Sequence, residues 1–283
     1  MRERRNRIVS RPELPDWRDS LPWPGVETHK HARGRLGVVS GRAAQTGAGR
    51  LAARAGLRIG AGLVRILCPP DAVSVIAPAI EAVMLTSFGS PESLAYEARS
   101  MDAVVIGPAA GVGDATVLNL RALAETGAAL VIDADGLTSF EHFPDELFEL
   151  LDRDDVLTPH EGEFARLFPG LLEAGREAAA TEAARRARAV VVLKGPETVI
   201  AAPDGRLAVN DNGTPWLATA GTGDVLAGMI GGLVAQRMDS FDAARAAVWM
   251  HAEAARGFGP GLIAEDLPER LPGVLAGLHG RAG

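Results

Sequence analysis

The sequence predicts an α/β fold, a mainly parallel sheet covered by helices on both faces. From Arg35 onward, short β-branched runs alternate with longer stretches rich in Ala, Leu and Arg, and polar or glycine-containing turns follow the runs. Repeated strand–helix units of this kind build parallel sheets whose two faces are both buried. The 283 residues contain no internal repeat or linker that would divide them, so we expect one large domain.

Six strands are predicted from apolar, β-branched runs, at 35–40, 63–68, 102–107, 128–136, 155–160 and 189–195. Residues 197–210 are predicted to form a hairpin, because Pro203-Asp204-Gly205 is a typical turn sequence.

Five helices are predicted between and after these strands, at 48–59, 114–126, 177–188, 224–236 and 241–256. Leu51, Ala55 and Ile59 have four-residue spacing in the first helix, which Gly60 and Gly62 end. Ser240 is the expected N-cap of the last helix and Gly257 its end.

Residues 1–27 are expected to form a loose arm, and residues 28–283 the domain. Residues 1–33 are rich in proline and arginine and show no sustained period. Pro12, Pro15, Pro22 and Pro24 exclude an amphipathic targeting helix, and the apolar stretch of a secretion signal is missing. No run reaches the ~18–20 apolar residues of a membrane span. We therefore expect a cytoplasmic protein without a membrane partner.

Charge and cysteine content narrow the function further. The 29 basic and 36 acidic residues give a net charge of −7, which argues against a nucleic-acid partner but leaves small anionic ligands open. The single cysteine, Cys68, excludes a disulfide within the chain and a zinc site built on cysteines. Its apolar neighbours predict a buried hydrophobe rather than a nucleophile.

The strongest candidate for a site is ATAGTGDVLAG, residues 218–228. Gly221 and Gly223 allow backbone angles closed to other residues, and the following helix would aim free amides at the turn. Such amides suit a phosphate or a developing anion. Asp224 either caps the helix or takes a proton from a hydroxyl that attacks phosphorus. Because a carboxylate beside an anion site costs electrostatic energy, the spacing favours the base.

Two further turns offer charged groups. Lys194 of KGPET follows a strand and could meet a phosphate, or could be a solvated lysine in a β-turn. In TPHEGEF, His160 and Glu163 could bind a polar ligand, and Glu163 a hydrated Mg²⁺. Alternatively, Glu161 and Glu163 are favourable charges in a first helical turn.

The remaining motifs are weaker. Asp133 and Asp135 of DADG line a cleft or start a turn. The turn at 107–113 does not match GxGxxG, and the chain has no GxxxxGK[ST] loop. Trp216 and Trp249 are expected to pack in the core or at its rim. His251 and Glu253 are expected on a helix surface. The turns nevertheless follow strands, so a parallel sheet would gather them at its carboxyl edge, where ligands bind.

The order of the motifs resembles the ADP/ATP-dependent NAD(P)H-hydrate dehydratase family of the ribokinase-like superfamily, from about residue 28 to 257. The motifs are KHARG (30–34), VVSG…TGAGRLAARAGLRIGAGLV (38–64), VVIGPAAGVG, LVIDADGLT, VLTPHEGEF, VVLKGPETVIAAPDG and LATAGTGDVLAGMIGGLVAQ. The resemblance implies a ribokinase-like three-layer sandwich. It also implies repair of the S-form of NADHX and NADPHX: a nucleotide phosphorylates the C6 hydroxyl, and phosphate then leaves to restore NADH or NADPH.

The resemblance also implies site residues. Asp224 would be the catalytic base and would contact NAD(P)HX together with Ala48, Gly111 and His160. The nucleotide contacts would be Lys194, Gly195, Pro196, Glu197, Thr198 and Gly223. Glu163 falls where the superfamily keeps a glutamate that organises Mg²⁺, here through water.

Donor and partners follow from the same resemblance. The alanine-rich, lysine-poor composition is typical of a bacterial source, so we expect ADP rather than ATP as co-substrate. We also expect a homo-oligomer, with a tetramer as one possibility. A separate NAD(P)HX epimerase is the expected functional partner, because the chain has no room for that domain.

Three departures from the family pattern concern the fit of the substrate. Ala109 replaces a glycine, His31 replaces an aromatic residue, and SGRAAQT (40–46) lacks a tyrosine. Two alternative functions share parts of the pattern. A kinase of a thiazole or pyrimidine alcohol would share the glycine turn and Asp224, but KGPET and the 107–113 turn favour the dehydratase. A non-catalytic nucleotide sensor would have no need of Asp224.

Overall fold

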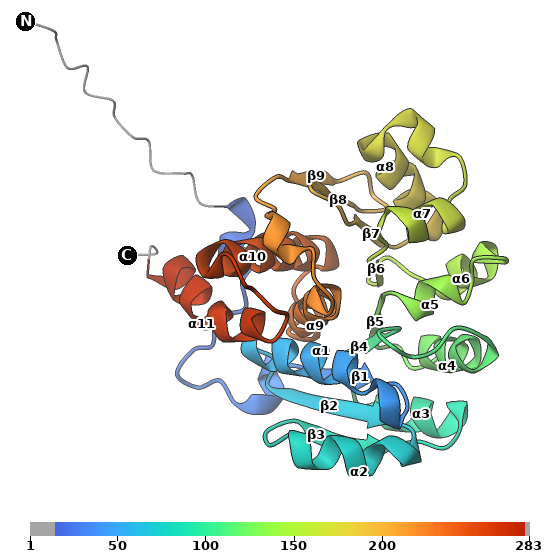
Figure 1. Ribbon diagram of the computed structural model, residues 1–283, viewed down its shortest axis with the longest axis vertical. Helices are drawn as coiled ribbons and strands as arrows, with labels where there is room; N and C mark the ends of the chain where they lie inside the picture. Colours follow the sequence, from blue (N-terminus) through green and yellow to red (C-terminus); the bar gives the residue numbers. More distant parts are fainter. Residues whose placement is uncertain (1–14, 281–283) are drawn as a thin grey trace, which may run out of the picture.

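Within residues 15–280, which the computed structural model describes, nine strands form one sheet in the order β3-β2-β1-β4-β5-β6-β7-β8-β9 (Figure 1). The strands are β1 (Arg35–Val39), β2 (Leu63–Cys68), β3 (Met84–Ser87), β4 (Ala103–Ile106), β5 (Ala129–Ile132), β6 (Val156–Leu157), β7 (Val190–Leu193), β8 (Thr198–Ala201) and β9 (Leu207–Asn210). All pairings from β3 across to β7 are parallel, and β7–β8 and β8–β9 are antiparallel. The mainly parallel sheet is as predicted.

The chain reverses its direction of travel across the sheet at β1. It moves outward through β2 to β3 and then returns to place β4 on the other side of β1. Such a switch point opens a crevice at the carboxyl ends of the strands.

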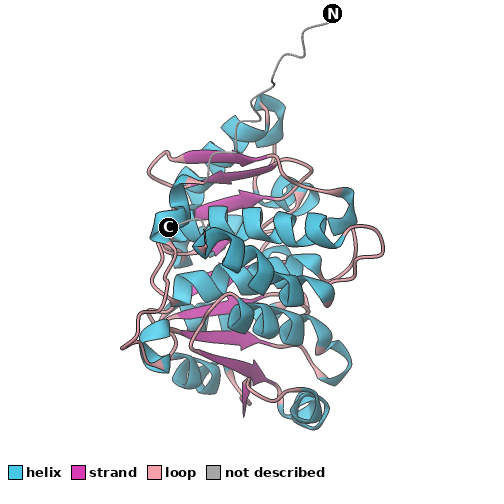
Figure 2. Cartoon of the chain, turned by 90° about the vertical axis from the view of Figure 1, so that its left-hand side faces the viewer, coloured by secondary structure: helices cyan, strands magenta, loops and turns pink. Residues whose placement is uncertain are grey.

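Helices cover both faces, which makes three layers (Figures 1 and 2). One face carries α1 (Gly47–Arg58), α2 (Val73–Ile76), α9 (Thr222–Ala235), α10 (Ser240–Phe258) and α11 (Asp266–His279). The other carries α3 (Pro91–Ala98), α4 (Asp114–Ala124), α5 (Asp135–Thr138), α6 (Pro144–Leu150), α7 (Glu161–Leu167) and α8 (Arg176–Ala187). Strand side chains alternate between the two cores: Val38 belongs to the first and Val39 to the second.

Small residues let α1 and α9 approach each other closely. A Cβ on Gly228 would lie 2.1 Å from the carbonyl oxygen of Ala52, and one on Gly232 would lie 3.0 Å from that of Gly56. Side chains at these positions would push the helices apart. The glycines of GDVLAGMIGG therefore fix the path of α9, and with it the position of the turn that precedes this helix.

The predicted elements are all present, with changes at their ends. The strand expected at 155–160 is only Val156–Leu157. The hairpin turn is confirmed by the amide of Gly205, which donates to the carbonyl of Ala202 at 3.1 Å. The caps predicted for α10 were wrong, because Asp239 accepts hydrogen bonds from two amides of the first turn.

The other end of α10 also differs from expectation. The helix continues through Gly257 to Phe258, and Gly259 ends it with a φ of 86°. Ser240, expected as N-cap, instead donates its hydroxyl to the carbonyl of Asp154 at 2.7 Å.

Among the described elements, β3 and the helices α2, α3, α5, α6, α7 and α11 are absent from the predicted set. The strand β3 lies at the sheet edge and is half-exposed, so its sequence MLTS carries little apolar signal. Helix α3 begins with a capping box at Ser90 and has Pro91 in its first turn, a local signal that the sequence does contain. Helix α11 includes Pro272 in its interior, and because proline usually ends a helix, the sequence did not predict a helix there.

The described part of the N-terminal arm is not loose. Residues 1–14 lie outside the described part, but Asp16–Ser20 forms a 3₁₀ helix whose Trp17 is only 4% exposed. The Trp17 ring packs edge-on against Trp249 of α10, with centroids 5.6 Å apart. Arg245 of the same helix donates to Asp16. Aromatic packing thus holds this segment on the domain, and Trp249 packs as predicted.

Two further predictions concern the core and the membrane. Cys68 is fully buried, and burial raises the pKa of its thiol to about 11, so it behaves as a hydrophobe. Among residues 15–280, the helices fall short of the length and apolar character needed to cross a bilayer.

Replacing Trp17 with alanine is expected to lower the free energy of unfolding by about 3 kcal/mol, because a buried indole is removed. Urea denaturation measures this change. Tyr96→Ala is the control: that ring is 71% exposed, and its loss is expected to change stability by less than about 0.5 kcal/mol. Equal effects of the two substitutions would show that Trp17 is not anchored in solution.

Candidate active site at the carboxyl edge of the sheet

An ion pair lies at the centre of the carboxyl edge. Lys194 follows β7 and Asp133 follows β5, and the Lys194 ammonium donates to Asp133 Oδ1 at 2.7 Å. The Asp133 side chain is only 3% exposed. A Cβ on Gly223 would lie 3.7 Å from both Lys194 Nζ and Asp133 Oδ2. The lysine charge therefore lies directly beside the glycine turn.

The glycine turn leads into α9 as predicted, although its two glycines differ. Gly221 is the N-cap, with a φ of 88° that favours glycine, whereas Gly223 is already helical. Asp224 is the third residue of the helix and so is not its cap. The first amides of α9 and the Lys194 ammonium give this end of the helix a positive potential.

Asp224 is half-buried and faces charges of both signs. The pKa of its carboxyl group is raised to about 6, chiefly by burial and also by the carboxylates of Asp133 and Asp135, while Lys194 opposes the rise. A carboxylate with such a pKa is ionised at neutral pH yet accepts a proton more readily than an ordinary aspartate. This is the behaviour required of a general base.

The DADG turn places a carboxylate in the cleft and also begins a helix. Ala134 has φ 48° and ψ −118°, a strained conformation for a residue with a Cβ. Asp133 on one side of it binds Lys194. Asp135 on the other side begins α5 and accepts a hydrogen bond from the amide of Gly111 at 2.9 Å. Strain at Ala134 thus accompanies the placement of two neighbouring carboxylates.

The 107–113 loop, which contains Gly111, lies against the loop that follows β1. Ala109, where the family pattern has glycine, adopts a φ of 55°. A Cβ on Gly41 would lie 2.1 Å from the carbonyl oxygen of Ala109, so the two loops are in close contact. Ala48 is half-buried in the first turn of α1, after the second of these loops.

His160 and Glu163 form the start of α7. His160 Nδ1 accepts from the amide of Gly162 at 3.0 Å, and Glu163 Oε2 accepts from the amide of His160 at 2.8 Å, which completes a capping box. The alternative prediction, that Glu163 is a favourable charge in the first turn of a helix, is therefore confirmed. The amide of Lys194 donates to the carbonyl of Pro159 at 2.9 Å, which ties this turn to KGPET.

A side-chain cage for a metal is missing from the described range: residues 15–280 contain no suitable group of three or more His, Cys, Asp or Glu. Mg²⁺ usually keeps several waters and binds through one or two carboxylates and substrate phosphates. Glu163 is a carboxylate at this edge, but its side chain is only 8% exposed and its Oε2 already accepts from the His160 amide, which leaves Oε1 for a contact through water.

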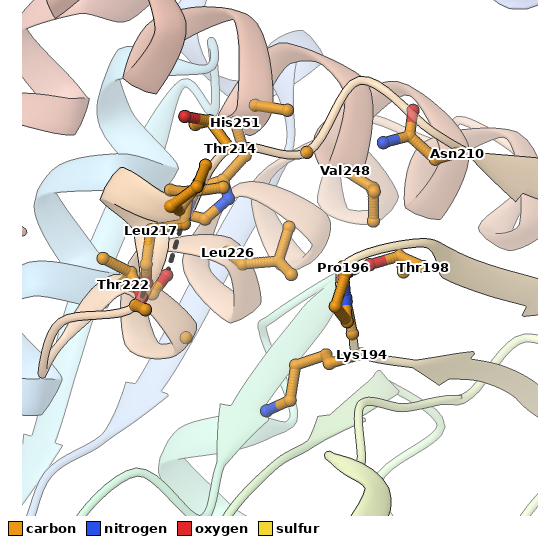
Figure 3. Close-up of a pocket in the computed structure, with 16 residues that line it drawn as sticks. Lys194, Pro196, Thr198, Asn210, Thr214, Leu217, Thr222, Leu226, Val248 and His251 are labelled. Atoms are coloured by element: carbon orange, nitrogen blue, oxygen red, sulfur yellow. Dashed lines mark hydrogen bonds between the residues drawn. The ribbon is translucent and has the colours of Figure 1, made fainter. Parts of the chain in front are cut away.

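A pocket of about 520 Å³ opens beside the ion pair (Figure 3). It is lined by Lys194, Gly195, Pro196, Thr198, Asn210, Gly213, Thr214, Pro215, Leu217, Ala218, Thr222, Gly223, Leu226, Val248, His251 and Ala252. Five of the six predicted nucleotide contacts are in this lining, and the sixth, Glu197, is not. One end of the pocket is thus charged and much of its wall is apolar, a combination that suits a nucleotide.

His251 was expected on the helix surface, and this was wrong, whereas Glu253 is half-exposed on α10. His251 is 6% exposed, and burial lowers the pKa of its imidazole to about 4. The neutral ring donates Nε2–H to the carbonyl of Thr222 at 2.9 Å and so holds the start of α9 (Figure 3). Glu253 accepts from Asn212 at 3.0 Å. Trp216 is 43% exposed and lies in the chain between the pocket-lining residues Pro215 and Leu217.

Arg176, the first residue of α8, is a site residue that the sequence analysis missed. Its Nη2 donates to the carbonyls of Leu193, Lys194 and Glu197 at 3.1, 3.1 and 3.3 Å. Its Nη1 donates to Glu161 at 2.8 Å. A Cβ on Gly195 would lie 2.5 Å from Nη2, so the guanidinium occupies the space that this glycine leaves.

The comparisons with known proteins agree with this geometry. A family model described as NAD(P)H-hydrate dehydratase matches residues 36–271. The chain belongs to this family. Family members include the ADP-dependent (S)-NAD(P)H-hydrate dehydratase of Xanthomonas campestris, 34% identical over 90% of this chain and 92% of that protein. The enzyme of the same name from Neisseria meningitidis is 38% identical over 89% of this chain and 83% of that protein.

Other relatives are longer. The bifunctional NAD(P)H-hydrate repair enzyme Nnr of Gloeobacter violaceus is 39% identical over 85% of this chain but only 49% of that protein. The chain thus spans about half the length of such relatives.

Solved structures establish the superfamily fold. The ADP/ATP-dependent NAD(P)H-hydrate dehydratase of Bacillus subtilis, co-crystallised with ATP and Mg²⁺, has a TM-score of 0.79 at 27% identity, over 93% of this chain and 96% of that chain. Hydroxyethylthiazole kinase of Pyrococcus horikoshii, at 21% identity and a TM-score of 0.63 over 86% and 89% of the chains, shows the shared fold alone. The three-layer sandwich is therefore ribokinase-like, as the sequence resemblance implied.

Arg176→Ala is expected to lower the free energy of unfolding by about 2 kcal/mol, because it leaves carbonyl groups of the KGPET turn without their donor. It is also expected to speed amide hydrogen exchange at 195–199. Arg185→Ala is the matched control on the same helix, since that side chain forms an exposed ion pair with Glu182. Identical exchange in the two variants would show that Arg176 does not hold the turn.

Proposed function

We propose that this protein is a nucleotide-dependent (S)-NAD(P)H-hydrate dehydratase, a lyase that returns NADHX and NADPHX to NADH and NADPH. The observation that carries the proposal is the half-buried Asp224 carboxylate at the start of α9, next to Lys194 at the charged end of the pocket. Membership of the family and the names of the relatives that span nearly the whole chain support it.

The nucleotide fits the pocket in one direction. Its phosphates belong at the charged end, where Gly223 and Lys194 lie beside the free amides of α9. Its base belongs at the apolar end, between Leu226 and Val248 on one side and Pro196 on the other (Figure 3). The backbone of Gly195, Glu197 and Thr198 continues this contact along the KGPET turn.

The hydrated dinucleotide is assigned to the other side of Asp224. Ala48, Gly111 and His160 are its proposed contacts, and they come from α1, the 107–113 loop and the start of α7. The three elements all lie at the carboxyl edge. The C6 hydroxyl then faces Asp224 while the terminal phosphate approaches from the pocket.

Asp224 accepts the hydroxyl proton as the C6 oxygen attacks the terminal phosphorus. A P–O bond to the substrate forms, and the bond to the departing nucleotide breaks. Lys194 and the α9 amides stabilise the charge on the transferring group. Inorganic phosphate then leaves C6 with the electron pair of the C–O bond while C5 gives its proton to water, and the double bond between C5 and C6 is restored. The base is regenerated when Asp224 releases its proton to solvent.

Mg²⁺ is proposed to bind with the nucleotide, where it would neutralise phosphate charge, and Glu163 would hold it through water. ADP is proposed as the donor, because the Xanthomonas and Neisseria relatives are named ADP-dependent. A homo-oligomer and a separate epimerase that supplies the S-form are also proposals.

Purified protein with ADP or ATP and Mg²⁺ is expected to restore the near-ultraviolet absorbance of reduced nicotinamide from NADHX. Asp224→Asn is expected to lower kcat by about 100- to 10,000-fold, because the proton acceptor is lost. Calorimetry with ADP is expected to give unchanged affinity in this variant. An absence of recovery with both nucleotides would refute the function, whereas full activity of Asp224→Asn would refute only the base.

The pH profile tests the environment of the base. Because Asp224 must be ionised to accept a proton, kcat/KM is expected to fall as the pH drops through about 6. Asp133→Asn removes a repelling carboxylate and frees Lys194 to approach Asp224, so it should move this midpoint to lower pH. Asp145→Asn, an exposed aspartate in the first turn of α6, serves as the control. A midpoint unchanged by Asp133→Asn would contradict the assigned charge coupling.

A further inference from the structure

The hydrogen bond between His251 and Thr222 acts on a peptide group at the phosphate end of the pocket. His251 Nε2 lies 2.9 Å from the carbonyl oxygen of Thr222 (Figure 3). That carbonyl belongs to the same planar peptide group as the amide of Gly223. In a trans peptide the C=O and N–H bonds point in opposite directions, so a donor that holds the carbonyl also sets the direction of the Gly223 N–H.

The Gly223 amide is available to a ligand. The first amide of α9 that donates back along the chain is that of Val225, which bonds to the carbonyl of Gly221 at 3.1 Å. The amide of Gly223 comes earlier and has no partner within the helix. Gly223 lines the pocket, and a Cβ on it would lie 3.7 Å from Lys194 Nζ. Its N–H therefore belongs to the end of the pocket that the proposed function assigns to phosphate.

The surroundings of His251 fix the state of its ring. A carbonyl oxygen can only accept, so Nε2 carries a proton. Burial lowers the pKa of the imidazole to about 4, so the ring is neutral at neutral pH and Nδ1 is unprotonated. His251 is only 6% exposed, so water is largely excluded from its bond to Thr222. In such an environment a hydrogen bond polarises its acceptor more strongly than it would in water.

We propose that His251 is a positioning residue for the transferred phosphate and acts through the Gly223 amide. The bond to the Thr222 carbonyl draws electron density toward the oxygen of the shared peptide group, which makes the Gly223 N–H a stronger donor and holds its direction. A donor fixed in advance where charge develops stabilises the transition state without reorganisation. This inference rests on the proposed function, which assigns the transferred phosphate to this end of the pocket.

Nitrogen NMR measures the polarisation in the ligand-free protein. The chain contains three Thr–Gly pairs, at 46–47, 126–127 and 222–223. Labelling threonine carbonyl carbons with ¹³C and glycine nitrogens with ¹⁵N therefore isolates three signals. His251→Leu removes the donor to the Thr222 carbonyl and is expected to move the 222–223 nitrogen to lower chemical shift. The 126–127 pair, which follows α4, is the internal control and should not move.

The phosphate contact is tested with ADP and AMP, which differ only by the terminal phosphate. His251→Leu is expected to lower the ADP/AMP affinity ratio, measured by calorimetry, about three- to tenfold, because a charge-assisted hydrogen bond is weakened. His142→Leu, at a side chain that is 85% exposed, is the matched control and should keep the ratio. A general loss of pocket structure would weaken both nucleotides alike and would not change the ratio.

Two further variants separate the donor from the packing of the ring. His251→Gln can still donate to the Thr222 carbonyl from its amide nitrogen, so it is expected to keep the ADP/AMP ratio. The side chain of His251→Asn is too short to reach that carbonyl, so this variant is expected to lose the ratio as His251→Leu does. A ratio that falls equally in all three variants would show that packing rather than the donor matters.

Different results defeat the two proposals. The inference is overturned if the 222–223 nitrogen does not move in His251→Leu, or if the ADP/AMP ratio stays at its wild-type value in both His251→Leu and His251→Asn. The dehydratase function stands in either case, because recovery of NADH from NADHX decides it. If the wild type restores NADH with neither ADP nor ATP, the function fails, while a reduced ADP/AMP ratio still assigns His251 to phosphate binding.

Discussion

The ion pair between Lys194 and Asp133 is the constraint around which the site is arranged. A carboxylate as buried as Asp133 requires a partner, and the only lysine in the described part of the chain besides Lys30 supplies it. The pair holds the ammonium beside Gly223 and prevents it from folding onto Asp224. Asp224 therefore keeps a carboxylate that is not neutralised by direct contact, and the residual repulsion from Asp133 increases its basicity.

Close packing between backbone segments makes this arrangement possible. Missing Cβ atoms bring α9 against α1, let the Arg176 guanidinium reach under the KGPET turn, and leave room for the lysine beside α9. Positive φ angles at Ala109 and Ala134 show that two loops at the edge are held in conformations that isolated alanines avoid. The surrounding contacts supply the stabilisation that these conformations lack.

The sequence predicted the sheet well, because strands buried on both faces are apolar throughout and helical spacing separates them. It also predicted that the polar turns would meet, since carboxyl ends of parallel strands share one edge. It did not reveal Arg176 or the Asn212–Glu253 contact, because these depend on which helix packs behind which turn. The edge strand β3 and the proline-containing α11 were missed for a local reason, the weakness of their patterns.

The packing of Trp17 has a consequence for the choice of an N-terminal truncation point. Its ring rests on Trp249, and the carbonyl of Trp249 is one of the two acceptors that orient Asn212. The segment before β1 thus packs behind the residues of α10 that stand next to the proposed site of the nucleotide base. Truncating the chain just before β1 to obtain a smaller protein for crystallisation would therefore remove packing that supports the nucleotide pocket.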